Sequence, residues 1–157
     1  MFRKMHVYDV DGVLLNSAHR HKFNISGELN VEHYFNNLTP EMLKKDSVLP
    51  LAKQYIKDCI NPEIYCVICS VRSMNHDQLF SIAEKIGLPD KLMLVGEHEP
   101  PLAPSQFLKR AALVRLFNLK QFRNIPRFFW DDSEKNLEAT KDLFTNSFLV
   151  KTRTCGQ

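Results

Sequence analysis

Short apolar segments alternate with amphipathic segments along most of this 157-residue chain. The apolar segments have the length and composition of buried strands, and the others repeat apolar residues with helical periodicity. The expected strands are residues 5–10, 64–69, 91–95, 127–130 and 147–151. The expected helices are residues 47–59 capped by Asp46, a helix to residue 86 capped by Asn75 or Asp77, residues 105–118, and a helix to residue 144 capped by Ser133. This alternation predicts an α/β fold, a three-layer Rossmann-like sandwich around a five-stranded parallel sheet.

Two segments depart from this alternation. Residues 15–45 are rich in His and Asn, and we expect them to form a small flap after the first strand, with a short helix that begins near Thr39 and Pro40. Residues 97–104 contain three prolines and are expected to be an irregular loop. No repeat or linker divides the chain, so we expect residues 1–157 to be one domain with no large cap domain.

Composition excludes few partners. The net charge of +3 is compatible with a phosphate-bearing partner but does not require one. No apolar segment approaches the roughly 20 residues that span a bilayer, so we expect a cytoplasmic protein without a membrane partner. Cys66 and Cys69 lie three apart on an expected strand and face opposite sides, which favours buried thiols over a shared metal. The sequence does not indicate an oligomeric state.

Polar side chains follow three of the expected strands. They are Asp9 and Asp11 after the first, Ser70 and Arg72 after the second, and Asp131 and Asp132 after the fourth, while Lys109 and Arg110 lie on the preceding helix. Because the carboxyl ends of parallel strands meet at one edge, we expect these groups to converge. A hydroxyl, cations and paired carboxylates are the groups that phosphoryl chemistry requires.

These residues resemble the four motifs of the haloacid dehalogenase superfamily, in the expected order. Residues 9–14 (DVDGVL) resemble the first motif, with Val13 where Thr is commonest. Ser70 resembles the second motif, Lys109 the third, and Asp131-Asp132-Ser133 the fourth. The resemblance implies an Mg²⁺-dependent phosphatase of the capless type, because the intervals between the motifs leave little room for a cap domain.

The resemblance also implies a role for each residue. Asp9 would attack the phosphorus and form an aspartyl-phosphate, and Asp11 would act as general acid and then general base. Mg²⁺ would be bound by Asp9, by the Asp11 backbone carbonyl and by an acid of the fourth motif, for which Asp132 is favoured over Asp131. Ser70 and Lys109 would hold the phosphoryl oxygens, with Arg110 as the alternative to Lys109.

The substrate is less closely defined. The chain is also similar to the phosphatase domain of polynucleotide kinase-phosphatases, through Ser70-Val71-Arg72 and the Trp130-Asp131-Asp132 strand end. That similarity implies nucleic-acid 3′-phosphate ends as substrate, with Arg72 contacting the phosphodiester backbone. Gly12, Arg72 and Arg110 are the candidate substrate-binding residues. Nucleotides or small phosphorylated metabolites are alternative substrates, and a non-catalytic phosphate-binding module or another phosphoryl acceptor are alternative functions.

Overall fold

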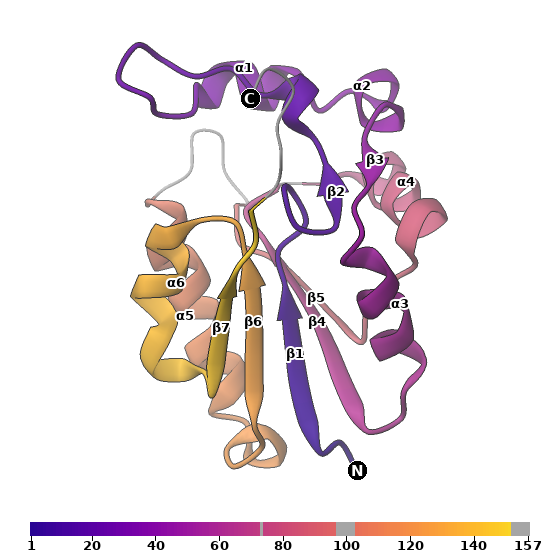
Figure 1. The fold of residues 1–157 in the computed structure, drawn as a ribbon, viewed down its shortest axis with the longest axis vertical. Helices are drawn as coiled ribbons and strands as arrows, with labels where there is room; N and C mark the ends of the chain where they lie inside the picture. Colours follow the sequence, from indigo (N-terminus) through magenta and orange to yellow (C-terminus); the bar gives the residue numbers. More distant parts are fainter. Residues whose placement is uncertain (73, 97–102, 152–157) are drawn as a thin grey trace.

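A five-stranded parallel sheet forms the centre of the molecule (Figure 1). The computed structural model describes residues 1–72, 74–96 and 103–151. The strands are β1 (Lys4–Tyr8), β4 (Ile64–Ser70), β5 (Lys91–Leu94), β6 (Arg127–Asp131) and β7 (Asn146–Leu149), in the order β5-β4-β1-β6-β7. Tyr8 of the central strand is level with Ile68 of β4 and with Trp130 of β6. The predicted parallel sheet is therefore confirmed, and the residues that follow β1, β4 and β6 meet at one edge.

Helices cover both faces of the sheet (Figure 1). They are α3 (Ala52–Ile60) and α4 (His76–Ile86) on one side and α5 (Ser105–Phe117) and α6 (Glu134–Thr140) on the other. Successive residues of β1 point to opposite faces. Tyr8 packs in the core that includes Tyr55 of α3, whereas Met5 and Val7 pack in the core that includes Leu113 of α5. Three short 3₁₀ turns, Ala18–Arg20, Lys120–Phe122 and Lys141–Leu143, complete the connections.

The predicted N-terminal caps are present in two helices. Asn75 caps α4 through a reciprocal pair of hydrogen bonds with Gln78, and Gly87, with φ of 80°, follows the helix. Ser133 accepts a hydrogen bond from the Asn136 backbone and caps α6. The helix predicted over residues 47–59 begins later, at Ala52, and Asp46 does not cap it. Most of the expected proline-containing loop lies outside the described residues.

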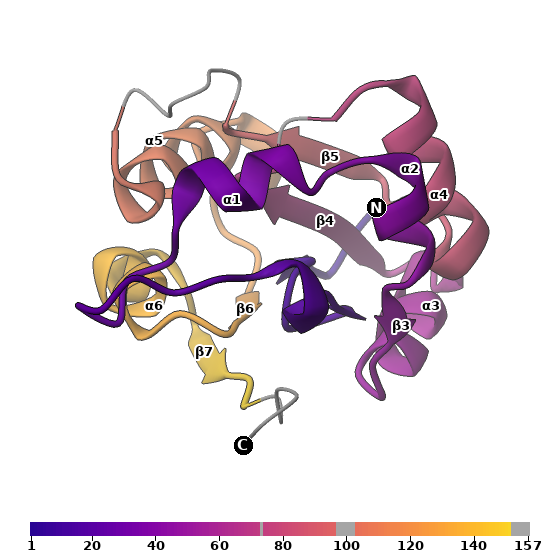
Figure 2. The ribbon, with the colours of Figure 1, turned by 90° about the horizontal axis from the view of Figure 1, so that it is seen from above.

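The flap projects from the carboxyl end of the sheet (Figure 1). Its first strand, β2 (Leu15–Asn16), pairs antiparallel with β3 (Ser47–Val48), so the two ends of the flap lie side by side where they join the rest of the domain. The flap contains α1 (Val31–Asn36) and α2 (Pro40–Lys44), and Thr39 caps α2 where the sequence predicts a helix start. Seen from above, α1 crosses over this end of the sheet (Figure 2).

Two further expectations concern the cysteines and the membrane. Cys66 and Cys69 are buried free thiols on β4, as predicted. Within the described ranges, every helix is too short or too polar to span a lipid bilayer.

Candidate active site

Three carboxylates converge at the carboxyl end of the central strands. Asp9 follows β1 directly, and its backbone N–H donates to the Trp130 carbonyl of β6 at 3.0 Å. That pairing places Asp9 beside Asp131 and Asp132, which end and follow β6. Carboxylate oxygens of Asp9, Asp131 and Asp132 lie within 4.8 Å of one another. The topology therefore brings together residues that are more than 120 positions apart in the sequence.

Lys109 of α5 reaches into this cluster. Its Nζ lies 2.8 Å from Asp131 Oδ2 and 3.2 Å from Asp9 Oδ1, and the side chain is only 1% exposed. Burial alone would lower the pKa of Lys109, but the Asp9 and Asp131 carboxylates raise it above its usual value. Asp131 also accepts hydrogen bonds from the Ser133 backbone at 2.9 Å and from Asn136 Nδ2 at 3.1 Å. The two carboxylates therefore favour the charged form of Lys109, and Asp131 is held by three donors.

The cluster carries more negative charge than Lys109 offsets. Burial is the largest influence on the pKa of Asp9 and raises it; Lys109 lowers it, but the neighbouring carboxylates add to the effect of burial, and the pKa stays well above its usual value. Burial and Asp131 likewise raise the pKa of Asp132 to about 6. Crowded carboxylates with raised pKa values and an all-oxygen donor set fit a divalent cation such as Mg²⁺. Asp9, Asp131 and Asp132 are the residues that would hold it.

Gly12 lets the chain pass close to Asp132. Its φ of +78° lies in the left-handed region, and a Cβ atom placed on it would lie 2.2 Å from Asp132 Oδ2. Only a residue without a side chain fits this turn. Gly12 thus shapes the rim of the carboxylate cluster.

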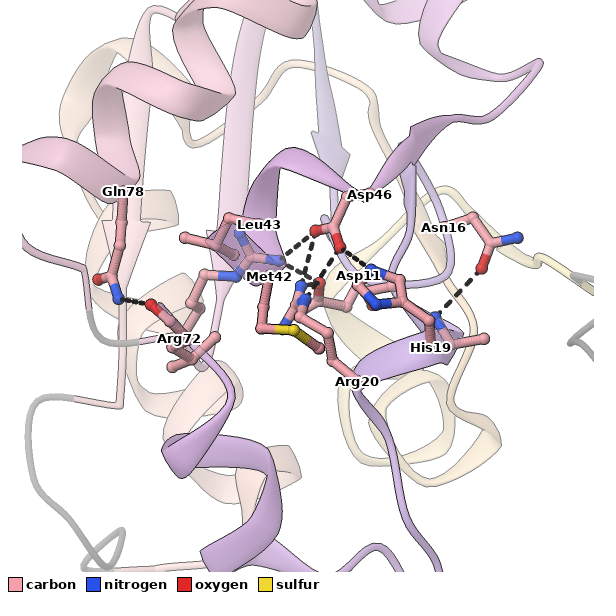
Figure 3. A network of polar contacts seen from close by, with 12 residues as sticks. Asp11, Asn16, His19, Arg20, Met42, Leu43, Asp46, Arg72 and Gln78 are labelled. Atoms are coloured by element: carbon pink, nitrogen blue, oxygen red, sulfur yellow. Dashed lines mark hydrogen bonds and ion pairs between the residues drawn. The ribbon is translucent and has the colours of Figure 1, made fainter. Parts of the chain in front are cut away.

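Asp11 lies in a second, buried network of ion pairs (Figure 3). Its Oδ1 accepts from Arg72 Nη2 and, at 3.3 Å, from Arg20 Nη2, while Oδ2 accepts from the Tyr34 hydroxyl at 2.7 Å. Burial would raise the pKa of Asp11, but Arg72, Arg20 and Tyr34 together hold it well below the usual range. The Asp11 carboxylate is therefore ionised and directed toward the flap.

Asp46 completes this network. It accepts from Arg20 Nε at 2.9 Å and Nη2 at 2.7 Å, and it pairs with His19 Nε2 at 2.7 Å (Figure 3). Arg72 Nη2 lies 3.7 Å away, and both arginine side chains are fully buried. The sequence analysis assigned Asp46 to a helix cap and did not single out Tyr34. Their partners lie 26 and 23 residues away, so no local pattern indicates either contact.

The structure brings most, but not all, of the candidate residues together. Ser70 ends β4 at the same edge, and its Oγ accepts from the Arg72 backbone at 3.1 Å. Arg72 is enclosed by carboxylates and is 0% exposed, so in this arrangement it presents no surface to a substrate. Arg110 points away from the cluster and forms a two-point ion pair with Asp142, at 2.6 and 2.9 Å.

Two cavities adjoin the carboxylates. One, of about 620 Å³, is lined by Asp9, Asp11, Lys109 and Asp132 and otherwise mainly by apolar side chains of the flap, α5 and the residues before α5. The other, of about 410 Å³, lies on the other side of Asp132 and is lined by Gly12, the start of the flap and residues near the end of β7. Asp9, Asp11 and Lys109 therefore face a cavity large enough for a small organic ligand, whereas Ser70 is not among its lining residues.

Comparison with models of known protein families shows which family this chain belongs to. Residues 1–95 match the model of the bacteriophage T5 5′-deoxynucleotidase family. The chain belongs to this family. The matched residues include Asp9, Asp11, Ser70 and the flap, whereas Lys109, Asp131 and Asp132 lie beyond them. A search of curated proteins gives no match.

Solved structures confirm the predicted α/β fold, which this chain shares with hydrolases of low sequence identity. L-2-haloacid dehalogenase from Xanthobacter autotrophicus superposes with a TM-score of 0.57 at 12% identity, over 93% of this chain and 76% of that one. A superfamily hydrolase from Geobacter sulfurreducens gives 0.53 at 16% identity, over 91% and 85%. D,D-heptose bisphosphate phosphatase from B. bronchiseptica, solved with magnesium and phosphate, gives 0.52 at 15% identity, over 93% and 79%. The family membership identifies a phosphatase, and these structures show that it has the same fold as hydrolases of the haloacid dehalogenase superfamily.

Proposed function

We propose that the protein hydrolyses the phosphomonoester of nucleotides, with Mg²⁺ as cofactor and an aspartyl-phosphate intermediate. One observation carries the proposal: in a member of a deoxynucleotidase family, Asp9 lies with Lys109 and two further carboxylates in a cluster that adjoins a cavity. A nucleophile, a fixed cation and a cation site are the groups that transfer of a phosphoryl group needs.

In the first step, an Asp9 carboxylate oxygen forms a bond to phosphorus while the ester P–O bond breaks. Lys109 Nζ stands 3.2 Å from Asp9 Oδ1, where it favours the ionised, nucleophilic form of Asp9 against the effect of burial and provides positive charge for the non-bridging phosphoryl oxygens. Because Lys109 is buried, its Nζ is fixed before substrate arrives, and little reorganisation is needed. Ser70, at the end of β4, is the proposed hydrogen-bond donor to the same oxygens.

Asp11 is the proposed proton-transfer residue. The leaving oxygen needs a proton in the first step, and the attacking water must lose one in the second. The contacts with Arg72, Arg20 and Tyr34 favour the ionised form, which is the form that accepts the proton from water. To serve as acid in the first step, Asp11 must leave at least part of this network.

The donor set supports Mg²⁺ as cofactor. Asp9, Asp131 and Asp132 supply carboxylate oxygens within 4.8 Å of one another, and the Asp11 carbonyl is a further proposed ligand. When bound, the ion would offset the charge of these carboxylates and of the phosphate. We favour Asp132 over Asp131 as a direct ligand, because Asp131 is already engaged by Lys109 and Asn136.

Nucleotides are favoured over nucleic-acid ends. The polynucleotide hypothesis assigns Arg72 to the phosphodiester backbone, but this guanidinium is buried between Asp11 and Asp46. The family match independently favours a mononucleotide. Phosphorylated metabolites, and a phosphate-binding module without catalysis, are the competing functions.

The test is phosphate release by the purified protein, with Mg²⁺ and with EDTA. The substrates are deoxynucleoside monophosphates, an aryl phosphate and a 3′-phosphorylated oligonucleotide. We expect Mg²⁺-dependent release that is fastest with the monophosphates and absent in Asp9→Asn. Folded protein that binds Mg²⁺ but releases no phosphate from any substrate would refute the proposed function and favour a binding role.

A further inference from the structure

We propose that the apolar cavity between α1 and the start of α5 holds the nucleoside part of the substrate. We further propose that Val31, Phe35 and Leu108 set the preference for nucleotides over phosphate esters without a base. The inference rests on the proposed function and assigns residues to it.

The position of the cavity supports this assignment. Asp9 and Lys109 line the same cavity as the apolar side chains, so an ester whose phosphorus is next to Asp9 can place its remaining atoms among those side chains. The volume of about 620 Å³ falls in the range of sites for small organic ligands. A phosphate with a short polar alcohol would leave most of this space unfilled.

The walls are chemically suited to a heterocyclic base. Leu29, Val31 and Phe35 of the flap line one side, and Val71, Pro104 and Leu108 line the other. In the view from above, α1 lies across the end of the sheet near the start of α5 (Figure 2), and residues of both helices line the cavity. The flat faces of a base gain free energy from contact with such side chains, whereas a sugar hydroxyl does not.

Polar side chains that line the cavity already have partners. The Tyr34 hydroxyl donates to Asp11 at 2.7 Å, and Ser105 Oγ donates to Asn136 Oδ1 at 3.2 Å. Asn136 Nδ2 in turn donates to Asp131 at 3.1 Å. Recognition by the described residues therefore relies on shape and apolar contact, which makes the apolar side chains the ones that set specificity.

The second cavity fits a base less well. Its lining includes Asn16, Ser17, Glu134 and Lys151, and its volume is about 410 Å³. A base placed there would have to displace water from charged side chains, and contacts with this lining would not offset the free-energy cost of that desolvation. The nucleoside is therefore assigned to the apolar cavity.

The experiment compares two substrates that differ only in the base. The kcat/KM of deoxyadenosine monophosphate and of the matching deoxyribose phosphate is measured for wild type, Phe35→Ala and Leu108→Ala. We expect the ratio of the two values to fall roughly tenfold in each variant, because each removes part of the apolar contact to the base. Phe107→Ala is the control, since Phe107 neighbours Leu108 on α5 but is 57% exposed and does not line the cavity.

The variants on opposite walls keep the test independent of a local folding defect. A ratio that stays unchanged in both variants, whether kcat/KM is unaltered or falls equally for the two substrates, overturns the assignment. The proposed phosphatase function would still stand in that case. If wild type releases phosphate from neither substrate, the proposed function fails and the cavity is tested by calorimetry. Deoxyadenosine monophosphate should then bind Asp9→Asn at least tenfold more tightly than it binds the double variants with Phe35→Ala or Leu108→Ala, and equal binding overturns the assignment.

Discussion

Removal of Asp46 should destabilise the protein more than removal of any exposed carboxylate. Asp46→Ala deletes two charge-assisted hydrogen bonds to Arg20, at 2.9 and 2.7 Å, each worth about 1.5–3 kcal/mol. Arg20 is 0% exposed, and its Nη1 already has no acceptor among the described residues. Water that enters the space left by the carboxylate recovers part of the loss. We therefore expect the free energy of unfolding to fall by about 3–5 kcal/mol.

Urea unfolding, followed by the fluorescence of Trp130 and by circular dichroism, measures this change. Asp142→Ala is a matched control, because Asp142 makes a similar two-point pair with Arg110, but at the surface, where its side chain is 65% exposed. We expect no resolved change in the control, since solvent screens such pairs. If Asp46→Ala costs no more stability than Asp142→Ala, the reasoning from burial is wrong.

Three other predictions test the site itself. Lys109→Met should lower kcat for phosphate release by about a hundredfold or more, because it removes the fixed cation 3.2 Å from Asp9; an unchanged kcat would contradict its role. Gly12→Ala should lower the free energy of unfolding by about 1–3 kcal/mol more than Gly27→Ala, measured in urea. Both glycines have positive φ, but only at Gly12 would a Cβ meet another side chain, at 2.2 Å. Burial raises the pKa of Asp132 to about 6, so as pH falls through that value a proton competes with the metal. Calorimetric titration with Mg²⁺ should therefore show affinity that is constant near pH 8 and falls below about pH 6; constant affinity down to pH 5 would contradict this.

The sheet and the carboxylate cluster could be predicted because they depend on local patterns and topology. Apolar runs mark strands, and parallel strands bring their carboxyl ends to one edge, so the residues that follow them must converge. Asp9, Asp131 and Asp132 were found in this way. Lys109 could also have been separated from Arg110 by helical periodicity: it lies three and four positions before Ala112 and Leu113, which are buried, and so shares their face of α5.

The buried ion-pair network could not be predicted, because its members come from separate segments. An Asp followed by Ser is typical of a helix start, and locally Asp46 cannot be distinguished from a cap. Its pairing with Arg20 depends on how the flap folds back over the sheet. The same is true of Tyr34, whose aromatic ring indicates packing, whereas its hydroxyl contacts Asp11. Arg72 was identified as a functional candidate, but burial places it behind Asp11 and away from the expected substrate.

The strand order has a consequence for synthesis of the chain. β1 and Asp9 directly after it are synthesised early, yet one of the two neighbours of β1 in the sheet is β6, whose residues are synthesised more than 110 positions later. Until then the central strand has an unpaired edge, and such edges invite pairing with other chains. Long-range parallel pairing is also slow. We therefore expect a nascent chain that ends before β6 to depend on chaperones and to lack phosphatase activity, even though it already carries the nucleophile.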